Sequence, residues 1–240
     1  MRFSTPDPAY TSSAKAAANF RLALRLAVYF VLLLWLVFFI DRLADLGLSR
    51  LGVAPRSAGG LIGILAAPLL HADLGHIASN SVPLLLGLTL MLYLFPHASA
   101  RALPVLYLGP GLLVWLIGRP SVHIGASGLI YGVLGFVFAS GLLKRDLRSA
   151  AAALVVWFMY SSMLWGVLPG RERISWEFHA AGLALGVLMA ILYRDLDRPP
   201  TKRYSWEDEA DPDDGDHDAP WRDPAFDPES VDDAESTWRE

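Results

Sequence analysis

Six stretches of the chain are rich in apolar residues and approach the length that crosses a lipid bilayer, which is about 20 residues. They cover residues 22–40, 76–95, 102–118, 126–143, 150–168 and 178–193. The first is not a cleavable signal peptide, because some twenty polar or small residues precede it and no small-residue cleavage site follows. The last is the shortest, so five or seven spans are the alternatives. We expect an all-α polytopic membrane protein with six transmembrane helices.

The composition agrees with membrane insertion and excludes several classes of protein. Apolar residues make up 54% of the chain and charged residues 18%, whereas a soluble domain is closer to half apolar and a quarter charged. An ordinary soluble enzyme is excluded, as is a nucleic-acid binder with a broad basic surface. Because the chain has no cysteine, disulfide frameworks, Cys-ligated zinc and thiol catalysis are excluded as well.

The acidic residues are concentrated at the C-terminus. Residues 195–240 hold 17 of the 24 Asp and Glu but only 5 of the 20 Lys and Arg. This segment is rich in Asp and Pro and poor in aliphatic residues, so it cannot bury enough apolar surface to offset its ordering entropy. We expect residues 196–240 to be a disordered acidic cytoplasmic tail, residues 21–195 to form the membrane core, and residues 1–20 to be a cytoplasmic segment.

The loops indicate the orientation. With the N-terminus inside, the inner segments hold twelve Lys and Arg and the outer segments six, as the positive-inside rule requires. An even number of spans then leaves both termini in the cytoplasm. The long outer loop, residues 41–75, is apolar enough to lie in or dip into the membrane interface. Since no organelle-targeting presequence is seen, we expect a multi-pass protein of a bacterial cytoplasmic membrane.

A few polar side chains fall inside the spans, where they are costly and are candidates for function. His76 and Asn80 open the second span, Ser127 and Tyr131 the fourth, and His179 the sixth. Every even-numbered span enters from the outer face, so these residues are expected at one depth beneath one surface. A serine nucleophile, an imidazole base and donors for an oxyanion would then lie at the same level.

The residues around the serine suit this chemistry. Ser127 lies between Gly125 and Gly128, and glycine permits unusual backbone angles and close approach. The Ser127 N–H would be an unpaired donor at a helix N-terminus, where the helix dipole favours negative charge. His76 and Asn80 are four residues apart, so they share one helix face.

Small residues would let the fourth and sixth spans approach closely. Gly128 and Gly132 form one small-residue face, and Gly182 and Gly186, which follow His179, form another. No acidic residue lies in the second, fourth or sixth span, so a Ser–His dyad is favoured over a triad.

Each signal has an ordinary explanation when it is taken alone. A single GxSG sequence is weak, paired glycines usually indicate helix packing, and Tyr131 could fill the interior. His97 and His123 are expected to be loop histidines. His71 and His76 could suggest a metal, but there is no third ligand and no HExxH sequence. We expect neither a metal nor a cofactor.

Taken together, residues 20–195 resemble the rhomboid intramembrane serine proteases. The resemblance is carried by three motifs and by their order and spacing. The motifs are H-x4-H-x3-N at His71, His76 and Asn80, G-x-S-G at Ser127 with Tyr131 and Gly135 after it, and H-x2-G-L-x2-G at His179, Gly182, Leu183 and Gly186.

The resemblance implies roles for these residues. Ser127 would be the nucleophile and His179 the general base, which then protonates the leaving amine. His76, Asn80 and the Ser127 N–H would form the oxyanion hole. The resemblance further implies that Tyr131 packs against the catalytic imidazole and that His71 supports the first outer loop. Substrates would be single-span membrane proteins cut near the outer face; no nucleic-acid partner is expected and the oligomeric state stays open.

One feature departs from the family pattern. Rhomboids often carry a structural Trp-Arg pair in the first outer loop, and that place here reads Ile62-Gly63. The departure concerns the rigidity and membrane docking of the loop more than catalysis.

Two other functions compete with proteolysis. A non-catalytic rhomboid-like protein that binds membrane clients usually lacks the serine or the histidine, and this chain keeps both. A small transporter would carry charged groups deeper in its spans, and none is seen there.

Overall fold

The computed structural model describes residues 4–169 and 175–202. Most of the expected acidic tail, from residue 203 onward, lies outside the described residues. Within the described ranges the chain is helical, with isolated β-bridges but no strand.

All six predicted spans are helices. They are α2 (Ala14–Ala44), α4 (Leu74–Leu94), α5 (Pro96–Ile117), α6 (Ser127–Lys144), α7 (Leu147–Tyr160), which the 3-10 helix η4 (Ser161–Val167) continues, and α8 (Trp176–Leu192). The first five, counting α7 with η4, are long and apolar enough to cross a membrane, and α8 is shorter, at 17 residues. The expected fold class, an all-α polytopic bundle, is confirmed.

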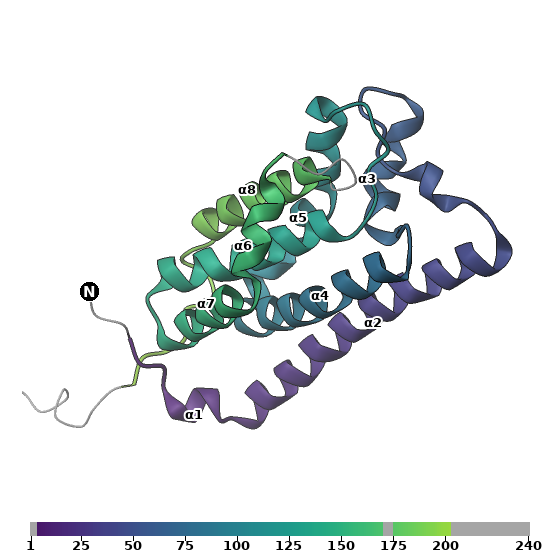
Figure 1. Cartoon of the computed structure of the whole chain (residues 1–240). Coiled ribbons are helices and arrows are strands. Elements are labelled where there is room, and N and C mark those ends of the chain that lie inside the picture. Colours follow the sequence, from purple (N-terminus) through teal and green to yellow (C-terminus); the bar gives the residue numbers. More distant parts are fainter. Residues whose placement is uncertain (1–3, 170–174, 203–240) are drawn as a thin grey trace, which may run out of the picture. The chain divides into compact units, whose positions relative to one another are not determined.

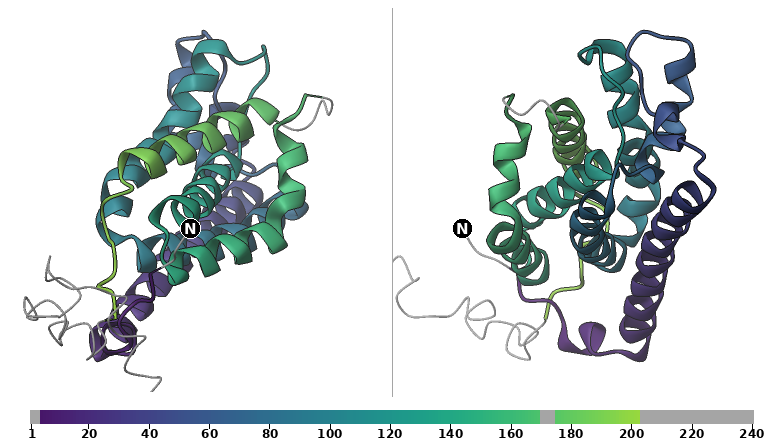
Figure 2. Two further views of the ribbon diagram at one scale, coloured as in Figure 1. Left: turned by 90° about the vertical axis from the view of Figure 1, so that its left-hand side faces the viewer. Right: turned by 45° about the vertical axis from the view of Figure 1, so that its right-hand side comes forward.

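Helix α6 is the centre of the bundle, and α4, α5, α7 and α8 all pack against it (Figure 1). Most of its residues are buried, whereas α2, which packs on α4, buries few. The right-hand view of Figure 2 shows α2 on the flank of the bundle. Both ends of α6 are therefore surrounded by other elements of the bundle.

Glycines set the distance between α6 and α8. A Cβ atom on Gly182 would stand 2.0 Å from the carbonyl oxygen of Gly128, and one on Gly186 would stand 2.1 Å from that of Gly132. These distances are far below van der Waals contact, so the two backbones touch directly, as small residues allow between membrane helices.

The first long loop folds into short helices rather than an extended linker. They are η1 (Leu48–Leu51), η2 (Gly59–Leu61), α3 (Gly63–Ala66) and η3 (Ala67–Leu69). Two side chains tie this loop to the end of α5. The guanidinium of Arg56 donates to the Gly118 carbonyl at 2.9 Å, and the indole N–H of Trp115 donates to the Ser57 carbonyl at 2.9 Å. Arg56 and Trp115 thus anchor the loop, although the position of the family's Trp-Arg pair is occupied by Ile62-Gly63.

At the opposite end of the bundle, the start of the described chain pairs with its end. A short helix, α1 (Pro8–Thr11), precedes α2. Just before it, the Asp7 N–H donates to the Pro200 carbonyl at 2.8 Å, and the Lys202 N–H donates to the Thr5 carbonyl at 2.9 Å. The two segments run side by side below the bundle in Figure 1. The first and last described residues consequently lie at the same end of the bundle.

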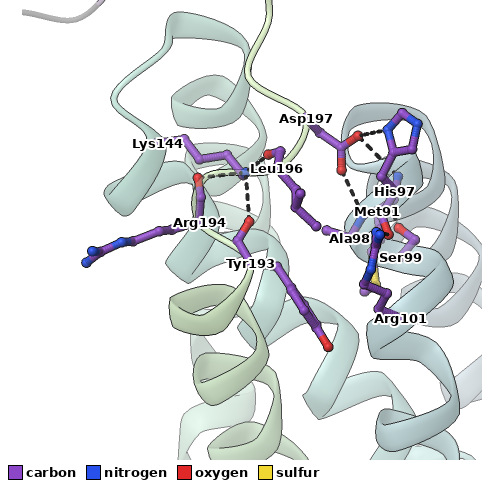
Figure 3. A network of polar contacts seen from close by, with 10 residues as sticks. All are labelled: Met91, His97, Ala98, Ser99, Arg101, Lys144, Tyr193, Arg194, Leu196 and Asp197. Atoms are coloured by element: carbon purple, nitrogen blue, oxygen red, sulfur yellow. Dashed lines mark hydrogen bonds and ion pairs between the residues drawn. The ribbon is translucent and has the colours of Figure 1, made fainter.

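A polar network holds the helix termini at this end (Figure 3). The buried ammonium of Lys144 donates to the carbonyls of Tyr193, Arg194 and Leu196, beyond the C-terminus of α8. The carboxylate of Asp197 accepts from the backbone N–H groups of His97 at 3.1 Å and Ala98 at 2.8 Å, and so caps the N-terminus of α5.

Candidate active site

Ser127 is the first residue of α6 and is half-buried. The chain reaches it through Gly125, whose φ of +112° lies in a region that side-chain-bearing residues rarely adopt. The Gly125 N–H donates to the carbonyl of Ala67 at 2.8 Å, which fixes the turn. Backbone N–H groups in the first turn of a helix have no intrahelical partner, so the Ser127 N–H is available as a donor.

His76 and Asn80 lie one turn apart in α4 and face the turn before Ser127. A Cβ atom on Gly125 would stand 2.6 Å from Nε2 of His76 and 3.7 Å from Nδ2 of Asn80. Residue 125 must therefore be glycine on grounds of space as well as of backbone angle. The Asn80 side chain is buried, and its Nδ2 has no hydrogen-bond partner among the described residues.

His71 lies behind His76, in the loop before α4. The two rings are 5.0 Å apart at an angle of 66°. Burial, with a smaller contribution from neighbouring His76, lowers the pKa of His71 to about 4, so its ring is neutral at neutral pH. Across residues 4–169 and 175–202, no group of three or more metal-binding side chains is found.

His179 lies in the first turn of α8. Its ring stacks on Tyr131, one turn further along α6 than Ser127, with centroids 4.1 Å apart and planes 11° apart. Its Nδ1 lies 2.9 Å from the carbonyl oxygen of Gly166 in η4. No hydrogen bond joins Ser127 to His179 in the described part of the chain; such bonds are often long before substrate binds.

The structure also shows a supporting residue that sequence reasoning missed. His123 was expected to be an ordinary loop histidine, yet it is buried, and its Nδ1 lies 2.7 Å from the hydroxyl of Ser175. Its backbone pairs in both directions with that of Val53. His123 thereby joins the first loop, the turn before α6 and the residue before α8, and no side-chain motif could have indicated this.

An ion pair reinforces the same junction. Arg119 Nε lies 3.2 Å from Glu177 Oε1. Glu177 is the acid nearest in sequence to His179, and it pairs with Arg119 rather than with the imidazole. The start of α8 is thereby held to the segment that leads into α6.

Three segments distant in sequence therefore meet near Ser127: α4, the start of α6 and the start of α8. His76 and Asn80 lie against Gly125, and His179 stacks on Tyr131. Gly128 packs against Phe178, the residue before His179, and Gly182 against Gly128. The other expected residues lie in this region, with His71 behind His76, whereas Gly186 packs on Gly132 further along the two helices.

Comparison with known proteins identifies the family of the chain. A family model described as the Rhomboid domain matches residues 58–196. Uncharacterised proteins of Mycobacterium tuberculosis and Mycobacterium bovis are each 38% identical over 172 residues, which is 68% of this chain and 72% of the relative. A protein of Mycobacterium leprae is 34% identical over 172 residues, 68% of each chain. The chain belongs to the rhomboid family.

Proposed function

We propose that the protein is an intramembrane serine endopeptidase that cuts single-span membrane proteins near the outer face of a bacterial cytoplasmic membrane. The observation that carries this proposal is the convergence on Ser127, with an imidazole stacked beside it on Tyr131 and two side-chain donors gathered at Gly125. A nucleophile, a base and donors for an oxyanion are the parts that acyl transfer needs.

In this mechanism Ser127 Oγ attacks the scissile carbonyl carbon while His179 Nε2 takes the hydroxyl proton. The oxygen of the tetrahedral intermediate accepts hydrogen bonds from His76 Nε2–H, Asn80 Nδ2–H and the Ser127 N–H. As the C–N bond breaks, the imidazolium returns the proton to the leaving amine. Water, activated by the same imidazole, then hydrolyses the acyl-enzyme and regenerates Ser127.

The membrane topology supports placing this site at the outer face. The pairing of the first and last described residues at one end of the bundle supports an even number of crossings, with α8 as the sixth. The preference of Lys and Arg for that end favours a cytoplasmic location for it. Residues 1–20 and 196–240 would then flank the core 21–195 on the inner side, and Ser127 would open outward to water.

Labelling with a fluorophosphonate in detergent tests the proposal. We expect wild type to be labelled and Ser127→Ala and His179→Ala to lose labelling. Ser140→Ala is the matched control, because Ser140 is a buried serine of the same helix and should leave labelling unchanged. A folded wild-type protein that resists labelling in several detergents would instead favour a client-binding rhomboid without protease activity.

A further inference from the structure

His179 has a backbone partner where many serine proteases have a carboxylate. Its Nδ1 lies 2.9 Å from the carbonyl oxygen of Gly166. A carbonyl oxygen can only accept a hydrogen bond, so this contact requires the hydrogen to be on Nδ1. A neutral imidazole protonated at Nδ1 carries its lone pair on Nε2, and Nε2 is the atom that must accept the serine proton.

We propose that the Gly166 carbonyl is the positioning group of this site, selecting the His179 tautomer that can act as a base. This inference rests on the proposed protease function. The carbonyl lies at the C-terminal end of η4, where backbone oxygens lack intrahelical partners and carry partial negative charge. It therefore both orients the neutral ring and stabilises the imidazolium that forms during attack.

The position requires glycine. A Cβ atom on Gly166 would stand 2.1 Å from the hydroxyl oxygen of Tyr131 and 3.0 Å from Nδ1 of His179. Any side chain here would push η4 away from the stacked rings and lengthen the bond to the imidazole. The absence of a side chain is thus what lets the backbone reach His179.

The same 3-10 segment also holds the other ring of the stack. The Tyr131 hydroxyl donates to the carbonyl of Met163 at 2.6 Å. Residues i and i+3 of a 3-10 helix lie on one face, so Met163 and Gly166 present their carbonyls to the two rings from the same side. Tyr131 fixes the plane of the imidazole, and Gly166 fixes which nitrogen is protonated.

Nitrogen-15 NMR of the full-length protein in detergent tests the tautomer directly. With six histidines in the chain, the His179 signals can be assigned by their loss in His179→Ala. At pH 8 we expect Nδ1 to show the protonated-type shift and Nε2 the unprotonated-type shift. The opposite pattern would overturn the inference whether or not the protein is an active protease.

A backbone substitution tests the contribution to activity. Replacing Val167 by its α-hydroxy acid analogue turns the preceding amide into an ester, which weakens the Gly166 carbonyl as an acceptor without adding a side chain. The matched control is the same exchange at Leu168. Each ester lacks one backbone N–H; at Leu168 this removes the bond to the Trp165 carbonyl (3.4 Å), and the carbonyl that is weakened is that of Val167 instead of Gly166.

We expect the Val167 ester to shift His179 toward the Nε2-protonated form and to slow fluorophosphonate labelling by about tenfold or more, part of the ~10²–10⁴-fold that a general base contributes. The Leu168 ester should keep the wild-type His179 tautomer and the wild-type labelling rate. Equal labelling rates in the two esters would overturn the positioning role. An unlabelled wild type that nevertheless shows Nδ1 protonation would refute the protease function itself while leaving the hydrogen bond in place.

Discussion

The two ends of α6 use buried polar groups in opposite ways. At the Lys144 end, a buried ammonium reaches three carbonyls and a carboxylate caps a helix, so each charge has partners. At the Ser127 end, the buried amide nitrogen of Asn80 has no hydrogen-bond partner among the described residues. Buried polar groups are normally paired, so the difference needs a reason.

We interpret the difference as one between groups that stabilise the fold and groups that the proposed reaction would use. An unpaired buried donor costs about 1–3 kcal/mol, a cost that a site can repay by binding charge that develops only in a transition state. The comparison therefore predicts that substitutions at the Ser127 end lower activity, and that substitutions at the Lys144 end lower stability.

The largest expected effect is at the Ser127 end. Asn80→Ala removes a donor of the proposed oxyanion hole and should lower kcat by about 10²–10³-fold. The free energy of unfolding should stay the same or rise, because no existing hydrogen bond of Nδ2 is lost. Cleavage kinetics and unfolding in SDS mixed micelles measure the two quantities. Thr89→Ala, further along the same helix, is the control. A large loss of stability in Asn80→Ala would show that Asn80 stabilises the fold.

At the other end, Lys144→Met should lower the free energy of unfolding by about 2–3 kcal/mol, since hydrogen bonds to charged groups contribute roughly 1.5–3 kcal/mol. The same SDS titration measures it, and kcat should stay within about twofold of wild type. Lys15→Met, at an exposed lysine, should be neutral. Loss of kcat in a fully folded Lys144→Met would contradict the division between the two ends.

A smaller loss is expected for Asp197→Ala. Removing a helix cap costs typically about 1 kcal/mol, and the ion pair with exposed His97 adds little. Asp195→Ala provides the comparison, because Asp195 is exposed and its ion pairs are with Arg194 and Arg198 at the surface. Similar unfolding curves for the two variants would show that Asp197 does not act as a cap.

The smallest effect concerns pH. The folded pKa of His71 is lowered to about 4, below the unfolded value of about 6.5. The unfolded chain therefore binds more protons between these values, and stability falls as pH drops through them. From pH 8 to pH 6 the loss due to His71 should be less than about 1 kcal/mol. In His71→Gln the free energy of unfolding should depend less on pH between 8 and 6. The same slope as in wild type would show that another group causes the acid sensitivity.

The helices were largely predictable from the sequence, because runs of apolar residues can be read without knowing their neighbours. Their ends were less so. Helix α2 begins at Ala14 rather than near residue 22, because the Ser13 hydroxyl caps it. Helix α5 begins at Pro96 rather than near residue 102, because proline suits the first turn of a helix.

The grouping of the candidate side chains could be predicted, because each has a distinctive chemical type at a regular spacing. The partners of these side chains could not. Every residue offers a carbonyl, so nothing in the sequence distinguishes Gly166 or Met163 as the acceptor for His179 or Tyr131. His123 likewise looks like any loop histidine until the chain brings Ser175 to it across 52 residues.

The pairing of residues 4–7 with residues 200–202 has a consequence for how the protein is made. These contacts join positions about 200 residues apart, so they cannot form until the last helix has left the ribosome. During synthesis the earlier helices enter the membrane first, and the bundle stays open at this end. We expect the final pairing to close it, so that a chain interrupted before residue 200 would insert its first helices without completing the bundle.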